Sequence, residues 1–364
     1  SAPRRSGGRP SPPPGIPPLT TSTMALPEGW TELKSFTETS VPVRTFIAPS
    51  GLRVCLLRCE GPLVTGYAVL ATEATTNDYA HRDDGLPHTL EHLIFLGSEK
   101  YPYKGVLDKL ANRCLAQGTN AWTDVDHTAY TITTAGSEGF LNLLPIYMDH
   151  VLYPTLTEEA FVTEIHHITG EGENKGVVYC EMQGRENKAE SLVDRACLDL
   201  LYPDTKCGYN AETGGKMVQL RKLTNAAIKR YHREFYRPNN CCLVVTGGVD
   251  AVELLSALAS TEKRIAEGGG GLETATLPRP WLREVEALKT TETTELEFPS
   301  EDESTGFVCL CWRGPHYNSF EEKLARKLLW DYLSDSSASP LKKAFVETDD
   351  ALAGDLNAVS EVFR

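Results

Sequence analysis

The sequence predicts an α+β fold, in which an antiparallel sheet carries helices packed on it. Strand-like and helix-like segments come in clusters along the chain, and not in the regular alternation that builds a doubly wound parallel sheet. Hydrophobic residues make up 41% of the chain, which is enough for real cores. A length of 364 residues leaves room for about two domains.

The elements follow in chain order. Alternating or continuous apolar runs, rich in β-branched and aromatic residues, predict strands at 43–47, 52–57, 64–72, 118–133 and 240–246. Apolar residues at helical spacing predict helices at 85–96, 105–116, 139–152, 158–168, 176–201 and 217–236. The turn at Ser50-Gly51 joins the first two strands into a hairpin.

These patterns divide the chain into four parts. Residues 1–27 are rich in proline and hold no acidic side chain, so we expect a disordered arm. Residues 28–260 form the first domain, and 261–300 read as a linker with the start of a second domain. Residues 301–364, with an expected strand at 306–312 and helix at 320–334, are too few to repeat the first domain. We therefore expect the chain to be an N-terminal fragment with an incomplete second copy.

The predicted helix at 85–96 carries the pattern His88-x-x-Glu91-His92. At about 100° per residue, these three side chains share one face, and Leu86 and Leu90 belong to the opposite stripe. Two imidazoles one turn apart can bind one zinc ion, while Glu91 can accept a proton from a zinc-bound water without being a ligand. The alternative is a buried helix whose histidines only form hydrogen bonds.

A zinc site needs a third protein ligand, and a catalytic one keeps a fourth position open. The best candidate is Glu181, in the predicted helix 176–201. Gly184 lies on the same helical face and would leave space for a close approach to the helix of His88. The alternative is an acidic residue on a solvated face, but Glu181 follows two valines and precedes a methionine.

Net charge and cysteine usage indicate which classes of partner to exclude and which compartment to expect. A net charge of −14 argues against nucleic acid or an anionic membrane as the main partner, and no run approaches the roughly 20 apolar residues that span a bilayer. None of the ten cysteines forms a C-x-x-C pair, and several lie in apolar runs. Packed, reduced thiols indicate a reducing compartment, so we expect a cytoplasmic protein. The basic N-terminal arm keeps a mitochondrion or plastid open as the alternative.

Several ordered motifs resemble the insulinase (pitrilysin-type) zinc metallopeptidases. They are HTLEH with FLGSEKYP, then GTNAWTDVDHTAY, GVVYCEMQG, and FYRPNN with LVVTGG. Within that family, the chain is most similar to the branch of presequence proteases and their cytosolic relatives. The resemblance covers residues 35–250 well and 285–364 in part.

The resemblance implies a role for each site residue. His88, His92 and Glu181 would bind one zinc ion per chain, and Glu91 would be the general base. Asn120, Ala121 and Trp122 would lie on the edge strand that pairs with an extended peptide substrate.

The same edge strand can be argued from physical chemistry, because a threonine-rich edge strand can accept a peptide through main-chain hydrogen bonds. The family often has a second glutamate seven residues before the third ligand, but this chain has Asn174 there.

Two functions of different classes follow. The first is a zinc metalloendopeptidase that hydrolyses extended, unfolded peptides. The second is a non-catalytic structural or assembly relative of the same fold. Relatives that lost catalysis lose one or more of the four residues His88, Glu91, His92 and Glu181, and all four are present here. A C-terminal half would be needed to close the catalytic chamber, so this chain alone could be poorly active.

Overall fold

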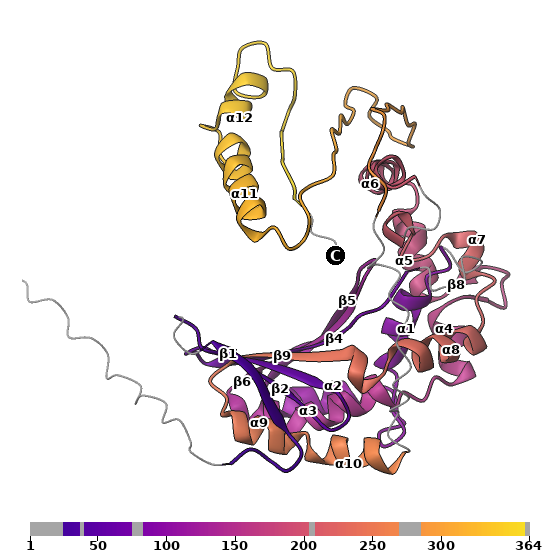
Figure 1. Ribbon diagram of the computed structural model, residues 1–364. Coiled ribbons are helices and arrows are strands. Elements are labelled where there is room, and N and C mark those ends of the chain that lie inside the picture. Colours follow the sequence, from indigo (N-terminus) through magenta and orange to yellow (C-terminus); the bar gives the residue numbers. More distant parts are fainter. Residues whose placement is uncertain (1–24, 37–39, 75–82, 204–207, 269–284, 361–364) are drawn as a thin grey trace, which may run out of the picture.

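The computed structural model describes residues 25–36, 40–74, 83–203, 208–268 and 285–360. A sheet of seven strands forms its centre, in the order β1-β2-β3-β9-β4-β6-β5 (Figure 1). The strands are β1 (Thr31–Phe36), β2 (Val43–Ile47), β3 (Arg53–Arg58), β4 (Leu63–Leu70), β5 (Ala116–Thr123), β6 (Thr128–Ala135) and β9 (Cys241–Gly247). A separate two-stranded ribbon joins β7 (His167–Ile168) and β8 (Asn174–Lys175).

The helices of the described residues surround this sheet and extend beyond it. They are α1 (Leu86–Ile94), α2 (Val106–Arg113), α3 (Ser137–Leu152), α4 (Glu158–Glu164), α5 (Val177–Arg185), α6 (Ala189–Leu201), α7 (Met217–Leu220), α8 (Asn225–Phe235), α9 (Ala251–Ala257), α10 (Ala259–Glu267), α11 (Phe320–Ser334) and α12 (Pro340–Phe345). Two 3₁₀ turns, η2 (Gly208–Asn210) and η3 (Pro238–Asn240), precede α7 and β9. No helix among these residues is long and apolar enough to cross a membrane.

The predicted α+β class is confirmed, and the sheet is mostly antiparallel. Only the central pair β3 and β9 runs parallel. β1 and β5 are the two edges, because each has a single neighbouring strand. Among the described residues, no strand pairs with the outer edge of β5, so this edge is free, and α1 packs beside this strand (Figure 1).

One face of the sheet is buried and the other is partly open. Along β4, burial alternates strictly, with Val64, Gly66, Ala68 and Leu70 buried and the residues between them more exposed. Phe140 of α3 lies so close to Gly66 that a Cβ there would be 2.6 Å from the phenyl ring. The aliphatic and aromatic core therefore lies between the sheet and its helices, including α1, α3 and α9.

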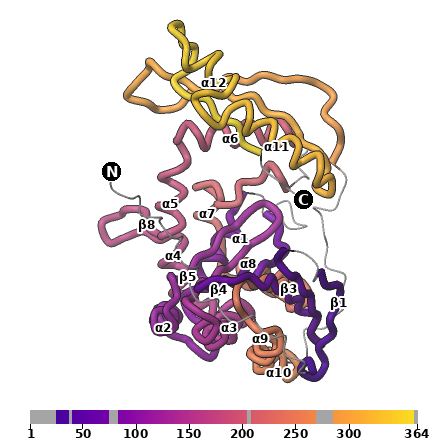
Figure 2. The backbone as a smooth tube through the Cα atoms, turned by 90° about the vertical axis from the view of Figure 1, so that its left-hand side faces the viewer, coloured from indigo at the N-terminus to yellow at the C-terminus, as the bar shows by residue number. Residues whose placement is uncertain are grey.

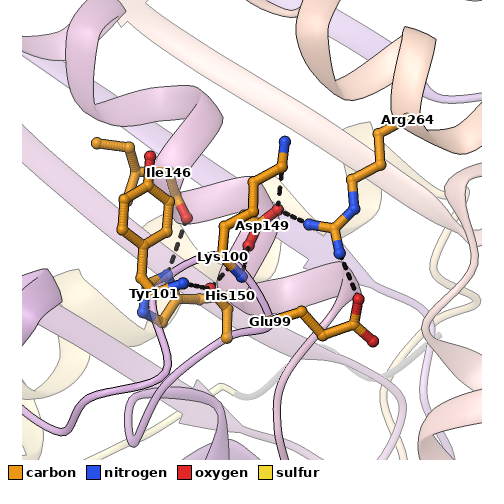
Figure 3. Close-up of polar contacts among 8 residues, drawn as sticks. Glu99, Lys100, Tyr101, Ile146, Asp149, His150 and Arg264 are labelled. Atoms are coloured by element: carbon orange, nitrogen blue, oxygen red, sulfur yellow. Dashed lines mark hydrogen bonds and ion pairs between the residues drawn. The ribbon is translucent and has the colours of Figure 1, made fainter.

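α10 is fastened to α3 by an ion-pair cluster (Figure 3). The Arg264 guanidinium donates to Asp149 and to Glu99, and Ser98 Oγ donates to the second carboxylate oxygen of Asp149 at 2.7 Å. Because α10 continues to Glu267 and packs on the first domain, the predicted linker does not begin at 261.

Three further segments differ from the sequence prediction. The helix expected at 176–201 is two helices, because the chain leaves the helix after Arg185 and restarts at Ala189. The helix expected at 217–236 likewise divides into α7 and α8, and the single strand expected at 118–133 is the hairpin of β5 and β6. The sequence does not predict β1, because TELKSF holds only two large apolar residues, Leu33 and Phe36, and their spacing does not alternate.

Residues 285–360 contact the first domain at few points. α11 confirms the helix expected at 320–334, but 306–312 is not a strand, because no neighbouring strand pairs with it. Cys309 Sγ lies 3.4 Å from Cys197 Sγ of α6, and Arg313 donates to the carbonyl of Leu201. α11 and α12 stand at the end of the molecule opposite to α10 in both views (Figures 1 and 2).

Candidate metal centre

α1 is an amphipathic helix: one face packs in the core, and the other carries the polar residues of the candidate site. Pro87 occupies its first turn, where the missing N–H costs no hydrogen bond. Leu86, Leu90 and Leu93 are each at most 2% exposed and anchor the helix in the core. The face predicted to hold His88, Glu91 and His92 is the less buried one, as the spacing indicates.

A close backbone contact fixes the start of this helix. Gly85 precedes α1 with a φ of 72°, in the left-handed region, and a Cβ there would be 2.7 Å from the carbonyl oxygen of Gly214. Only glycine accepts both the φ and the contact. The predicted close approach at Gly184 is wrong, because nothing lies within 4 Å of a Cβ built there.

The structure brings His88, His92 and Glu181 together. Glu181 Oε2 lies 3.6 Å from Nε2 of His88 and 3.5 Å from Nε2 of His92, and the ligand atoms of all three lie within 4.8 Å of one another. Two ligands bound at about 2.1 Å to one ion at a tetrahedral angle are about 3.4 Å apart. The separations of Glu181 from both histidines therefore already match a zinc site, and the remaining pair of ligand atoms would have to approach by at most about 1.4 Å.

Glu164 of α4 stands behind His92. Its side chain is 7% exposed, and its Oε2 lies 3.9 Å from Nδ1 of His92, an ion-pair distance rather than a hydrogen bond. Lys104 donates to the other carboxylate oxygen at 3.0 Å. A carboxylate on the far nitrogen of a metal-binding histidine fixes the ring and makes it a stronger ligand.

The pKa values of the two histidines diverge. Burial, followed by the neighbouring His92, lowers the pKa of His88 to about 4, so its ring is neutral at pH 7. Burial would also lower the pKa of His92, but Glu164, Glu91 and Glu181 outweigh it and raise the pKa. A neutral imidazole is the form that binds a metal, and His88 meets this condition over the whole neutral range.

Glu91 lies on the same helix face as the two histidines, and a hydrogen bond from strand β5 fixes its side chain. Thr123, the last residue of β5, donates from Oγ1 to Glu91 Oε2 at 2.5 Å. Burial raises the pKa of Glu91, and the Thr123 hydrogen bond and the His92 charge only partly offset it. A raised pKa brings a carboxylate closer to the range in which it can both accept and return a proton.

The three residues expected to meet substrate lie on the edge strand β5. Asn120 and Trp122 are exposed on one face of the strand, and Ala121, opposite Tyr130 of β6, is half-buried on the other. The strand runs directly into Thr123 and so leads to Glu91. An extended peptide on the free edge of β5 would pass the metal cluster.

Sequence reasoning missed Glu164 and Thr123. Glu164 could have been found as the acidic residue one turn after the buried Phe161, both on the apolar face of α4. Asn174, which stands where the family often has a second glutamate, accepts a hydrogen bond at Oδ1 from Nε2 of His166 at 2.8 Å. No sequence pattern indicated Thr123, because its contact with Glu91 depends on how α1 packs against β5.

Comparison with known proteins gives consistent matches. A family model described as insulinase (peptidase family M16) matches residues 79–181, and one described as the peptidase M16 inactive domain matches 222–360. An uncharacterized protein of Caenorhabditis elegans is 43% identical over 84% of this chain and 30% of its own length. The mitochondrial presequence protease of Schizosaccharomyces pombe is 29% identical over 74% of this chain and 27% of its own length.

Solved structures agree at the level of the fold. Pitrilysin matches with a TM-score of 0.52 and 18% identity over 65% of this chain and 24% of its own. A putative M16-like peptidase from Alicyclobacillus acidocaldarius matches with a TM-score of 0.51 and 20% identity, over 62% of this chain and 51% of its own.

Fold, motifs and matches define an insulinase-type protein. The chain belongs to the insulinase family, peptidase family M16, and spans about 30% of the length of the curated relatives it matches.

Proposed function

We propose that this chain carries the zinc centre of a metalloendopeptidase that hydrolyses extended, unfolded peptides. The observation that carries the proposal is the joint position of three ligand atoms, a carboxylate beside them and a free strand edge leading to them. His88, His92 and Glu181 would hold one zinc ion. When bound, zinc supplies Lewis-acid chemistry, because it lowers the pKa of a coordinated water to about 7 and polarises a peptide carbonyl.

Glu91 would move the proton. Its carboxylate accepts a proton from the attacking water and delivers it to the leaving amine, and Thr123 keeps one of its oxygens in place. Burial raises the pKa of Glu91, which makes its carboxylate a stronger base toward the proton of the water. Glu164 would hold His92 in position and take no part in the proton transfer.

β5 would hold the substrate. A peptide paired with its free edge is bound through main-chain hydrogen bonds, which recognise an extended conformation more than a particular sequence. This favours unfolded peptides over folded proteins as substrates. Asn120, Ala121 and Trp122 are the residues that such a peptide would face.

The substitution Glu91→Gln tests the mechanism. It keeps the shape of the side chain but cannot accept a proton, so cleavage of an unstructured peptide should fall by about 10²- to 10⁴-fold while zinc content is unchanged. Glu159→Gln, an exposed position on α4, is the matched control and should keep full activity. The assay belongs on a form that cleaves peptides to begin with. Loss of zinc from Glu91→Gln would make Glu91 a ligand and overturn its assigned role.

A second candidate is a non-catalytic structural relative of the same fold. It is favoured by the description of the model that matches residues 222–360, which names an inactive domain. That match begins after Glu181 and leaves the metal cluster in the region of the other model. A protein that binds zinc and cleaves no unstructured peptide in any form, with or without a second half, would favour this candidate.

The compartment also stays a proposal. The Schizosaccharomyces pombe relative is a mitochondrial presequence protease, and presequence protease 1 of Arabidopsis thaliana, 31% identical over 48% of this chain, is chloroplastic/mitochondrial. We propose the cytoplasm for this chain, because its cysteine pattern indicates packed, reduced thiols, with a mitochondrion or plastid as the alternative.

A further inference from the structure

Trp122 is held by a chain of two hydrogen bonds in the β5–β6 hairpin. Its indole Nε1 donates to Nε2 of His127 at 2.9 Å, and Nδ1 of His127 lies 2.7 Å from Oδ1 of Asp126. An indole N–H can only donate, so Nε2 of His127 must be the acceptor. His127 is therefore neutral in this arrangement, and its Nδ1–H donates to Asp126.

The indole lies on the partly open face of the sheet. Trp122 is 41% exposed and meets the ring of Tyr67 edge-on, with 6.2 Å between ring centroids. Ala129, directly opposite Trp122 in the ladder with β6, is fully buried although it lies on this face. The indole is thus a flat, rigid apolar surface one residue before Thr123, which binds Glu91.

We propose that Asp126 and His127 are positioning residues that hold Trp122 as a wall for one substrate side chain, and that this wall selects a large apolar one. The inference rests on the proposed peptidase function. A peptide paired with the free edge of β5 would place the side chain opposite Trp122 on the same face, with Cβ atoms about 4.5–5.5 Å apart. A large apolar side chain there gains contact with the indole, whereas alanine does not reach it.

The arrangement depends on the charge of His127. A proton on Nε2 removes the acceptor of the indole N–H, so protonation releases Trp122. The hydrogen bond to Asp126 raises the pKa of His127, against the effect of burial, and the charges of Asp126 and Asp124 add to it. Among the described residues these are the charged groups that act on His127, and both lie in the same turn. Protonation, and with it the release of Trp122, therefore occurs at a higher pH than for an unperturbed histidine.

Fluorescence tests the positioning without any peptidase assay. The spectrum of the protein minus that of Trp122→Phe isolates Trp122, and this difference should titrate between pH 5 and 9 with a midpoint above 6.5. Asp126→Asn should move the midpoint to lower pH, because it removes the charge that favours protonation. His127→Gln keeps an acceptor for the indole but cannot titrate, so its difference signal should be flat. A flat signal in the unmodified protein, or a titration that survives in His127→Gln, would overturn the proposal.

Selectivity tests the consequence. An unstructured peptide and a variant with phenylalanine in place of one alanine, at successive positions near the cleaved bond, should differ in kcat/KM by on the order of ten-fold at one position. His127→Ala should reduce that ratio toward one, whereas His127→Gln should keep it. Lowering the pH from 8 to 6 should reduce the ratio in the unmodified protein but not in His127→Gln.

Failure of the proposed function has a different signature. If no form of the protein cleaves either peptide, the ratio of the two peptides' binding affinities for Glu91→Gln is measured instead. If Trp122→Ala leaves the ratio between the phenylalanine and alanine peptides unchanged at every position, Trp122 does not contact the substrate side chain. The fluorescence experiment still tests separately whether Asp126 and His127 position Trp122.

Discussion

At the residue scale, Glu164 contacts the candidate metal cluster through His92. It lies near Nδ1 of His92, whereas Glu181 lies near Nε2 of the same ring. Its carboxylate is nearly buried, yet its pKa is lowered, first by its interaction with His92 and also by Lys104. It is therefore charged at neutral pH. A buried carboxylate that stays charged needs charged partners, and here they are Lys104 and His92, which we propose as a zinc ligand.

Glu164→Gln should weaken zinc binding by about 10- to 100-fold, since it removes the charge that orients His92 and strengthens it as a ligand. Titration with zinc against a competing chelator measures this. Glu159→Gln, on the exposed side of the same helix, is the control and should bind zinc normally. Equal affinity in the two variants would show that Glu164 serves only the packing of α4.

Sequence reasoning reached the residues with a local pattern and missed those that depend on distant contacts. The i, i+3, i+4 spacing of His88, Glu91 and His92 gives one helical face in any chain, and the structure has it. Glu164 is 72 residues from His92, and its contact follows from how α4 packs on α1. Roles for Asn120, Ala121 and Trp122 stay predictions, although their edge position is observed.

At the scale of elements, the start of α1 depends on a glycine that has no room for a side chain. Gly85→Ala would place a residue in the left-handed region, at about 1–2 kcal/mol, and force its Cβ against the carbonyl of Gly214. We expect a loss of at least that size in the free energy of unfolding, measured with denaturant. Gly184→Ala on α5 is the control, since its Cβ meets nothing, and should be neutral or up to about 1 kcal/mol more stable. Equal stability of the two variants would contradict the account of Gly85.

Element types were predicted better than element ends. The 3.6-residue pattern predicted α1 and α3 because each buries an apolar face, and it predicted α11 because the pattern there continues over 15 residues. The break between α5 and α6 carries neither proline nor glycine at 186–188, and its local mark is Asn187, directly after the helix end, a weaker stop signal than proline. The strand expected at 306–312 had the right composition, but a strand also needs a neighbour to pair with.

At the scale of the whole molecule, residues 285–360 expose much of their apolar surface. Val308 is 94% exposed, Leu310 81% and Phe320 70%, and several further apolar residues of α11 are more than half exposed. Large apolar side chains that are exposed in such number along one segment indicate a surface on which other protein packs. In the same chain, the Glu181 side chain of the candidate metal cluster is 40% exposed, and no described strand pairs with the outer edge of β5.

We predict that this chain alone binds zinc but cleaves peptides poorly. Ordering a flexible peptide costs about 2–5 kcal/mol, and one strand edge open to water offsets little of it. Adding a complete C-terminal half, fused or as a separate chain, should restore cleavage of short unstructured peptides and reduce binding of a hydrophobic dye. Turnover by the monomeric 364-residue chain equal to that of the longer form would prove this wrong.

Zinc content measured by elemental analysis on the chain, on Glu91→Gln and on Glu181→Ala tests the central claim most directly. Glu91 and Glu181 both lie beside the histidines, but only Glu181 is assigned as a ligand. We expect one zinc per chain in the first two proteins and loss of the metal from Glu181→Ala. Full occupancy in Glu181→Ala, or no zinc in the unmodified chain, would contradict the assignment of the site.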